Sequence, residues 1–370
     1  MKVLQTVKYY HPSKGGMESV VKNIVEGVSE VDDGIKFTVY SNNHASNFRN
    51  TAETYDNIHI LREATPAFIK SQPLNIRYKS LPKFLAVNDV VHHHYPYPNM
   101  EFALVRNARI LRDKRLIITW HANIENSRWG FMKKYYDPLV RRLLSLARYI
   151  VVTSPQLFEH SVVLKDFKDK VRVIPLSFDP TFGVEGTAPK TIALDKPRNI
   201  LFVGKLRAYK GVSYLIDAIR DSDALLTIVG EGEEEANLRN QVKLLDLESR
   251  VSFLKGVDNT ELIKIYRQSD LFVLPSISEA EAFGVVQLEA MAQGLPVINT
   301  NLRSGVPFVS LDKVTGVTVE PKSSENLSLA INTLLNNKAL YEAYSLNSMK
   351  RSRLFTREKL ALAYLELYQA

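Results

Sequence analysis

The sequence contains no cysteine, which excludes disulfide bonds and thiolate metal sites and fits a reducing compartment. It also lacks any run of about 18 or more apolar residues, the length that a membrane-spanning helix needs. The start, MKVLQTVKYYHP, has no long apolar core of the kind found in signal peptides. With 370 residues, 45% of them hydrophobic and 24% charged, we expect a soluble globular protein of two domains.

Charge is unevenly distributed along the chain. Residues 1–180 hold 26 Lys and Arg against 17 Asp and Glu, a surplus of +9, whereas residues 181–370 hold 22 against 23, a net of −1. Such asymmetry indicates that the first half faces an anionic partner, either nucleic acid or a phospholipid surface. A solvated basic face without a partner would give the same counts. No nucleic-acid-binding module is recognisable, so nucleic acid is not expected as a partner.

Two basic stretches carry much of this surplus, RNARILRDKR at 106–115 and KKYYDPLVRRLLSLAR at 133–148. The second is predicted to form an amphipathic helix with Lys133, Lys134, Arg141, Arg142 and Arg148 on it. Basic amphipathic helices lie on anionic lipid surfaces. We therefore expect a cytoplasmic protein that is peripheral on the inner face of the plasma membrane.

Short apolar, β-branched runs alternate with longer helical patterns along the whole chain. The first helical pattern follows the glycine pair 15–16 and keeps Val20, Val21, Ile24, Val25 and Val28 on one face. The runs that predict buried strands are KVLQTV (2–7), KFTVYS (36–41), IHIL (58–61), DVVHHH (89–94), RLIITWH (115–121), RYIVVTS (148–154), VRVIPL (171–176), NILFVG (199–204), LLTIVG (225–230), VSFLKG (251–256), LFVLPS (271–276) and PVINT (296–300). This alternation predicts an α/β protein with doubly wound parallel sheets.

The rhythm breaks once, over PTFGVEGTAPKTIALDKPRN at 180–199, which is rich in Pro, Gly and Thr and has no sustained period. We expect a linker there, between an N-terminal domain over 1–180 and a C-terminal domain over 181–354. A final helix at about 355–370 can pack back on the first domain. Open α/β sheets bind ligands beyond the carboxyl ends of their strands, so two such sheets facing across a cleft would hold a ligand there.

The stretch SEAEAFGVVQLEAMAQGLPV at 278–297 follows one such strand end. Gly284 and Gly294 predict the start and end of a helix that contains Glu289, with Glu281 in the loop before it. Backbone N–H groups around residues 283–285 would form an anion-binding terminus. A carboxylate beside an anion site suits vicinal hydroxyls, as sugars and ribose offer. The alternative makes Glu281 a capping or solvated residue and Glu289 a surface one.

The loop FVGKLRAYKG at 202–211 follows another strand of the same predicted sheet. It gathers Lys205, Arg207 and Lys210, whose positive charges can neutralise a leaving diphosphate. This loop and the stretch at 278–285 should converge on one ligand, because parallel strands end at the same edge of a sheet. The two loops together favour a nucleotide-sugar site.

These motifs resemble those of the retaining glycosyltransferases of the GT-B fold, family-4 group. The resemblance rests on Gly-Lys-Leu at 204–206, Lys-Gly at 210–211, Gly-x-Gly at 230–232 and Glu-x₇-Glu at 281–289 followed by AMAQGLPV. GGMES at 15–19 and TWHAN at 119–123 extend it over nearly the whole chain. One departure is Lys205, where the family commonly has Arg; the charge is kept but the bidentate fork is lost.

The resemblance implies a role for each matching residue. Lys205 and Lys210 would bind the donor diphosphate, with Arg207 beside them, and stabilise charge as the sugar bond breaks. Glu289 would hold the ribose and Glu281 would face the transferred sugar. The backbone of Phe283, Gly284 and Val285 would contact the donor's sugar and phosphate. Gly15 and Gly16 would let the first loop approach the diphosphate closely, because neither has a side chain.

Two further residues of the first domain match the family. His121 would hydrogen-bond a hydroxyl of the donor sugar, although a core histidine bonded to backbone is the alternative. Glu18 would contact the acceptor, or it is a first-turn glutamate favoured by the helix dipole. The run His92 to His94 invites a metal site, but adjacent strand residues face opposite sides, so only His92 and His94 could share an ion. No metal and no cofactor are expected, since the family uses cationic residues and helix dipoles instead.

The implied reaction transfers a sugar with retention at the anomeric carbon. The stretches INTNLRSGVPFVS and TGVTVEP resemble bacterial enzymes that assemble polysaccharides on a lipid carrier, which favours GDP-mannose as donor, then a UDP-sugar, and a lipid-linked saccharide as acceptor. A dehydrogenase would need Gly-x-Gly-x-x-Gly, and Glu235 stands where the third glycine belongs. An epimerase or phosphorylase of the same fold and a non-catalytic nucleotide-sugar binding subunit stay open as alternatives.

Overall fold

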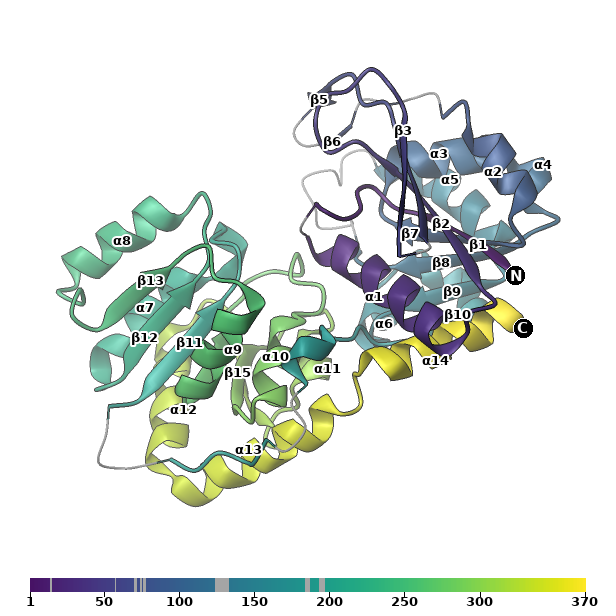
Figure 1. Cartoon of the computed structure of the whole chain (residues 1–370). Coiled ribbons are helices and arrows are strands. Elements are labelled where there is room, and N and C mark those ends of the chain that lie inside the picture. The colour runs from purple at the N-terminus through teal and green to yellow at the C-terminus, as the bar shows by residue number, and fades with distance from the viewer. Residues whose placement is uncertain are drawn as a thin grey trace. The chain divides into compact units, whose positions relative to one another are not determined.

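The chain forms two compact units, each built around one β-sheet whose strands are mostly or entirely parallel (Figure 1). The computed structural model describes residues 1–13, 15–56, 58–69, 72–73, 75, 78–123, 133–183, 187–192 and 197–370. Unit 1 comprises Met1–Leu176 and Arg357–Ala370, and unit 2 comprises Ser177–Thr356. These divisions lie close to the boundaries at 180 and 354 expected from the sequence.

Unit 1 has a sheet in the order β10-β9-β8-β7-β1-β2-β4-β3. All of its neighbours are parallel except β3 and β4. The strands of unit 1 are β1 (Lys2–Thr6), β2 (Lys36–Asn42), β3 (Thr51–Tyr55), β4 (Ile58–Glu63), β7 (Val90–Tyr95), β8 (Arg115–Trp120), β9 (Tyr149–Val152) and β10 (Val171–Val173), with β5 (Phe68–Ile69) and β6 (Gln72–Pro73) forming a separate pair. Its helices are α1 (Gly16–Val31), α2 (Leu81–Val87), α3 (Pro98–Arg106), α4 (Ala108–Leu111), α5 (Lys133–Leu146), α6 (Pro155–Glu159) and α14 (Arg357–Gln369), with a 3₁₀ segment at Leu164–Lys170.

Unit 2 has a fully parallel sheet in the order β13-β12-β11-β14-β15-β16. Its strands are β11 (Asn199–Val203), β12 (Leu225–Val229), β13 (Val251–Leu254), β14 (Leu271–Leu274), β15 (Val297–Thr300) and β16 (Gly316–Val319). Its helices are α7 (Val212–Ala218), α8 (Glu235–Leu244), α9 (Asn259–Gln268), α10 (Val286–Ala292), α11 (Val306–Val309), α12 (Ser324–Asn336) and α13 (Lys338–Ser352), with 3₁₀ turns at Pro180–Phe182, Ala208–Lys210 and Ile219–Asp221. The prediction of two doubly wound α/β domains is confirmed.

Side chains alternate across the sheet of unit 1, and this alternation separates an apolar layer from a polar one. Leu4 and Val91 point into the core formed with α2, α3 and α5. The next residues along the same strands, Gln5 and His92, hydrogen-bond Tyr368 of α14. Period-two alternation is what an extended strand imposes. The polar residues on β1 and β7 therefore face the C-terminal helix.

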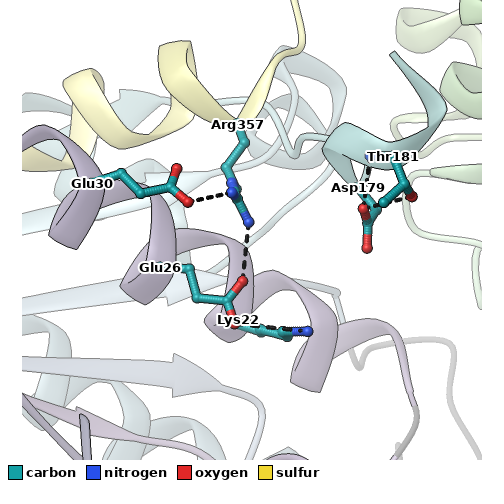
Figure 2. Close-up of polar contacts among 6 residues, drawn as sticks. All are labelled: Lys22, Glu26, Glu30, Asp179, Thr181 and Arg357. Atoms are coloured by element: carbon teal, nitrogen blue, oxygen red, sulfur yellow. Dashed lines mark hydrogen bonds and ion pairs between the residues drawn. The ribbon is translucent and has the colours of Figure 1, made fainter. Parts of the chain in front are cut away.

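The C-terminal helix α14 packs on α1 within unit 1 (Figure 1). Figure 2 shows Arg357, at the start of α14, reaching two carboxylates of α1: it contacts Glu26 at 3.0 Å and also pairs with Glu30. Gly27 lets the helices approach, since a Cβ there would lie 2.9 Å from Cγ of Arg357. The helix is thus tied to unit 1 by its first turn.

Four strands and one helix differ from the sequence-based expectation: the runs listed above include none of β3, β5, β6 and β16, and β5 and β6 have only two residues each. Strand β3 has the sequence TAETY and is exposed throughout, so it lacks the apolar run by which strands were recognised. Strand β16 has the sequence GVTV and is only half covered, and it was missed for the same reason. The helix expected to begin at Gly284 begins at Val286, because Gly284 has φ +75°, which is not helical. Gly294, with φ +77°, follows the helix end as expected.

Candidate active site

The loops after β11 and β14 lie next to each other at the carboxyl edge of the unit 2 sheet. These two strands are neighbours although they are not consecutive in sequence, and the strand order reverses there. Gly211 has φ +66°, and a Cβ on it would lie 2.1 Å from the carbonyl oxygen of Pro275. The backbone N–H of Ile277 donates to the carbonyl of Tyr209 at 2.8 Å. Ligands of open α/β sheets bind at such a reversal point.

Lys210 and Glu281 form an ion pair between these two loops. Both side chains are about nine-tenths buried, with exposed fractions of 10% each. The hydroxyl of Ser276 donates a 3.0 Å hydrogen bond to Oε2 of Glu281, the same oxygen that contacts the ammonium group of Lys210. Gly204, at the end of β11, has φ +155°, a backbone conformation that residues with a side chain rarely adopt, and it lies next to the Lys210 ammonium group. The structure therefore places a preformed charge pair where the sequence predicted a ligand.

Lys205 and Arg207 differ from Lys210 in their surroundings. Both are exposed, whereas Lys210 is buried, although all three belong to the same short loop. Exposed charges are screened by water and salt, while a buried charge acts at nearly full strength. Lys210 is therefore the least screened positive charge of the loop, and Glu281 balances it in the free protein.

The backbone at residues 283–285 forms a tight turn before α10. Phe283 is buried and packs against Phe308 and Phe355 at ring distances of 6.5 and 6.3 Å. Gly284 has no room for a side chain, because a Cβ would lie 2.7 Å from Cδ2 of Leu274. Helix α10 has only seven residues, so its dipole is short. The turn fixes the backbone of Phe283, Gly284 and Val285 at the edge of the sheet.

Glu289 lies in the first turn of α10 and is held by the phenol of Tyr266, which donates to its Oε2 at 2.9 Å. Burial is the main cause that raises the pKa of Glu289 to about 7; the hydrogen bond from Tyr266 opposes this rise and the nearby charge of Asp179 adds to it. Asp179 itself caps a 3₁₀ turn by accepting from the N–H and hydroxyl of Thr181 (Figure 2). Glu289 is thus a partly buried carboxylate, not the surface residue of the alternative reading.

In unit 1, the glycine pair and Glu18 lie together at the start of α1. A Cβ on Gly15 would lie 2.3 Å from Oε2 of Glu18, whereas one on Gly16 would meet nothing within 4 Å. Burial lowers the pKa of Lys8 and raises that of Tyr9 to about 12. The negative charge of Glu18 acts upward on both pKa values, opposing the effect of burial on Lys8 and adding to it on Tyr9. Glu18 is therefore folded over Gly15 and makes contacts with the β1 loop.

His121 follows β8 and is joined to the histidines of β7. Its Nε2 lies 2.9 Å from Nδ1 of His94, and the two rings stack at 5.2 Å. Burial lowers the pKa of His121 to about 3, with a smaller contribution from His93, so the imidazole is neutral at neutral pH. Among the residues that the structure describes, Nδ1 of His121 has no hydrogen-bond partner.

The metal reading of the histidine run finds no support in the geometry. His92 and His94 do share one side of β7, with ring centroids 4.4 Å apart, while His93 faces Glu101 at 3.4 Å. Both ring nitrogens of His92 and of His94 are already within hydrogen-bond distance of protein groups. No set of three metal-ligating side chains is found in the described part of the chain.

The chain matches two known families over most of its length. Residues 14–182 match the family described as Glycosyltransferase Family 4, and residues 186–351 match the Glycosyl transferases group 1. It is 30% identical over 380 residues to the O-antigen chain mannosyltransferase C of Escherichia coli, covering 100% of this chain and 98% of the relative. The chain belongs to these glycosyltransferases.

Other relatives of this glycosyltransferase agree with the assignment. A D-rhamnosyltransferase of Pseudomonas aeruginosa is 32% identical over 289 residues, covering 75% of this chain and 73% of the relative. The sucrose-phosphate synthase of Thermosynechococcus elongatus has the same fold, with a TM-score of 0.78 at 22% identity and coverage of 100% of this chain and 98% of that structure. The GT-B class expected from the sequence is confirmed.

Several residues that support the site of this glycosyltransferase were not found from its sequence. Ser276 and Tyr266 bind the two glutamates, and Asp179 sets the charge near Glu289. Ser276 directly ends the run LFVLPS, so its position after a buried strand was an available signal. Tyr266 and Asp179 come from elements distant in sequence, and no local pattern indicates them.

Proposed function

We propose that this glycosyltransferase moves a sugar from a nucleotide-diphospho-sugar to a lipid-linked saccharide acceptor, with retention at the anomeric carbon. GDP-mannose is the favoured donor and a UDP-sugar the next, and the product belongs to a bacterial cell-surface polysaccharide such as an O-antigen. The buried Lys210–Glu281 pair at the reversal point of the unit 2 sheet is the observation that carries the proposal. The mannosyl and rhamnosyl activities named for the relatives support the sugar and the pathway.

The charge pair suggests how the donor is received. A diphosphate reaching Lys210 competes with Glu281 for its ammonium group, because phosphate oxygens offer a full charge to the same donor. The released carboxylate, still held by Ser276, then accepts hydrogen bonds from hydroxyls of the sugar. Glu289, on α10, accepts hydrogen bonds from the ribose hydroxyls, and the backbone at 283–285 contacts sugar and phosphate. Lys205 and Arg207 add a solvent-exposed positive field.

The residues present suit a front-face displacement. With the donor bound, Glu281 is held by Ser276 and by the sugar hydroxyls, and Glu289 is held by Tyr266, so neither carboxylate is assigned as a nucleophile. In the proposed step the bond between the anomeric carbon and the phosphate oxygen breaks as the acceptor oxygen bonds that carbon. The acceptor's proton passes to the departing phosphate. Positive charge from Lys210 stabilises the diphosphate, so no divalent metal is required.

A donor panel with purified protein tests the proposal. GDP-mannose, UDP-glucose and ADP-glucose are each incubated with a lipid-linked saccharide, and the product is followed by mass spectrometry with and without excess chelator. We expect GDP-mannose to give a product one hexose heavier, at the same rate in chelator. Absence of transfer from all three donors would contradict the proposed activity, and loss that added metal restores would contradict metal independence.

Unit 1 also carries a basic surface suited to an anionic membrane. A hollow of about 540 Å³ is lined by Arg112, Lys114, Arg148, Lys170 and Arg172 against a single carboxylate, Asp169. The amphipathic helix predicted over 133–148 forms as α5, but its apolar residues Val140, Leu143 and Leu144 are buried in the unit 1 core. The expectation that this helix lies on lipid by its apolar face is therefore wrong. We propose instead that the basic hollow binds the cytoplasmic leaflet electrostatically.

Liposome flotation distinguishes a basic surface that binds the membrane from one that is only solvated. We expect binding to rise with the fraction of anionic lipid and to fall with salt, because each cation near the surface contributes about 1 kcal/mol. Among the described residues, no helix is both long and apolar enough to cross a membrane. Reversing Arg112, Arg148 and Arg172 to Glu should abolish flotation. Reversing three exposed lysines of unit 2, Lys243, Lys264 and Lys350, changes the net charge equally and should leave flotation largely intact; equal loss in both variants would contradict a localised surface.

A further inference from the structure

A continuous run of buried polar side chains connects the C-terminal helix to His121. Its members come from four elements of unit 1 and, apart from His121 itself, are all fully buried. They are Gln5 on β1, His92 and His94 on β7, Thr119 on β8, and Tyr364 and Tyr368 on α14. Buried polar groups are costly unless each is paired, so a network of this size is specified side chain by side chain.

The hydrogen bonds of this network have a direction. The side-chain amide of Gln5 donates from Nε2 to the hydroxyl of Tyr368 at 2.9 Å. Its Oε1, which can only accept, lies 2.9 Å from Nε2 of His94. Nε2 of His94 must therefore carry the proton, and Nδ1 of His94 is left as an acceptor.

The same reasoning extends one residue further. Nδ1 of His94 lies 2.9 Å from Nε2 of His121, so Nε2 of His121 must be the donor. A neutral imidazole carries one proton, which leaves a lone pair on Nδ1 of His121. Burial, with smaller contributions from neighbouring histidines, lowers the pKa of His94 well below its usual value and that of His121 to about 3. Both rings are therefore neutral at neutral pH, and the count of one proton per ring holds.

The hydroxyl of Tyr368 sets the direction of the first hydrogen bond in this network. Its hydroxyl accepts from Gln5 and lies 2.7 Å from Nδ1 of His92, whose other nitrogen lies 2.7 Å from the hydroxyl of Thr119. A tyrosine hydroxyl has a single proton, and donating it to His92 leaves the oxygen free to accept the amide of Gln5. Arg357 docks the start of α14 on α1 (Figure 2). Arg115 contacts the carbonyl of Tyr368 near the end of the helix, and the two contacts together hold the tyrosine in place.

We propose that Tyr368 and Gln5 are positioning residues that set the tautomer of His121, so that Nδ1 presents a lone pair to a hydroxyl of the substrate. This inference rests on the proposed function, in which His121 contacts a sugar hydroxyl. The opposite tautomer would present an N–H and could not accept that proton. The C-terminal helix thus acts on the site through a hydrogen-bond chain rather than by direct contact.

Histidine NMR on the substrate-free protein tests the inference. Long-range ¹⁵N–¹H correlation spectra of ¹⁵N-histidine-labelled full-length protein distinguish protonated from unprotonated ring nitrogens, and His121→Gln assigns the signals. We expect Nε2 of His121 to be protonated in the natural protein. Tyr368→Phe, which removes one hydroxyl, should shift His121 to a mixture of tautomers. It should also lower kcat about tenfold, the effect of one hydrogen bond, with little change in the KM of the donor.

Matched variants keep the result interpretable. Tyr364→Phe removes a hydroxyl one helical turn away that contacts Thr119 and not Gln5, so the His121 tautomer should stay unchanged. Gln5→Met removes the hydrogen-bond acceptor of His94 and should likewise give a mixture of His121 tautomers. It provides a second test of the inference if Tyr368→Phe folds poorly. Protonation of Nδ1 in the natural protein, or an unchanged tautomer in both Tyr368→Phe and Gln5→Met, would overturn the inference. The spectra need no substrate, so they test the tautomer of His121 independently of its proposed role in sugar binding. Full turnover in His121→Ala would refute that role without affecting the assignment of the tautomer.

Discussion

Replacing Glu281 with alanine should lower turnover by about two decades or more while nucleotide binding stays the same or tightens. The side chain is proposed to face the transferred sugar, so the loss falls on interactions made as the sugar bond breaks. Glu281 also occupies Lys210 in the free protein. Removing the carboxylate leaves the ammonium group free for the diphosphate, which is why the affinity for the nucleotide should not fall.

The measurement combines steady-state kinetics with calorimetric titration of the nucleoside diphosphate. Glu281→Gln keeps the shape and a hydrogen-bond acceptor for Ser276 but loses the charge, and it should be nearly as slow as the alanine variant. Glu279→Ala, two residues earlier in the same loop, is the control and should change turnover by less than about threefold. Unchanged turnover in Glu281→Ala would refute the proposed role of this glutamate.

Replacing Lys210 with alanine should reduce both catalysis and stability. Turnover should fall by about two to three decades, the usual loss when one preorganised charge is removed from a transition state. The free energy of unfolding should fall by about 3 kcal/mol, because Glu281 is left buried without its counter-ion. Glu281 stays buried in this variant because its side chain is short and is held by Ser276, whereas a longer side chain such as that of lysine could extend to solvent.

Lys205→Ala provides the matched control for Lys210. It removes the same charge from the same loop, but at an exposed position, so its effects should be several-fold smaller. The double variant of Lys210 and Glu281 should regain most of the lost stability without regaining activity, because neither charge is then left alone. Equal losses in Lys205→Ala and Lys210→Ala would contradict the assignment of the diphosphate to the buried lysine.

The sequence predicted the alternation of strands and helices well because buried parallel strands are short apolar runs. It failed where that signal is weak, as in the exposed β3 and the short β16. It located the loop with Lys205, Arg207 and Lys210 but could not rank them, because burial depends on the neighbouring loop after β14. It also predicted an amphipathic α5 without showing that its apolar side faces the protein core.

The environment of His121 illustrates why the rest could not be predicted. The sequence indicated a histidine at a strand end and a histidine run on another strand. The groups that set the protons of these rings lie on α14, with Thr119 and Tyr364 separated by 245 positions and His92 and Tyr368 by 276. Alternation along β7 correctly placed His92 and His94 on one side. Only the packing of α14 shows what that side meets.

The anomeric configuration of the product tests the central claim most directly. The sugar is transferred from its nucleotide diphosphate to the lipid-linked acceptor in excess chelator, and the new linkage is assigned from the proton NMR spectrum of the isolated glycan. We predict the configuration of the donor, because in the proposed step the acceptor attacks from the face that the diphosphate leaves. A product of inverted configuration would contradict this account of the site.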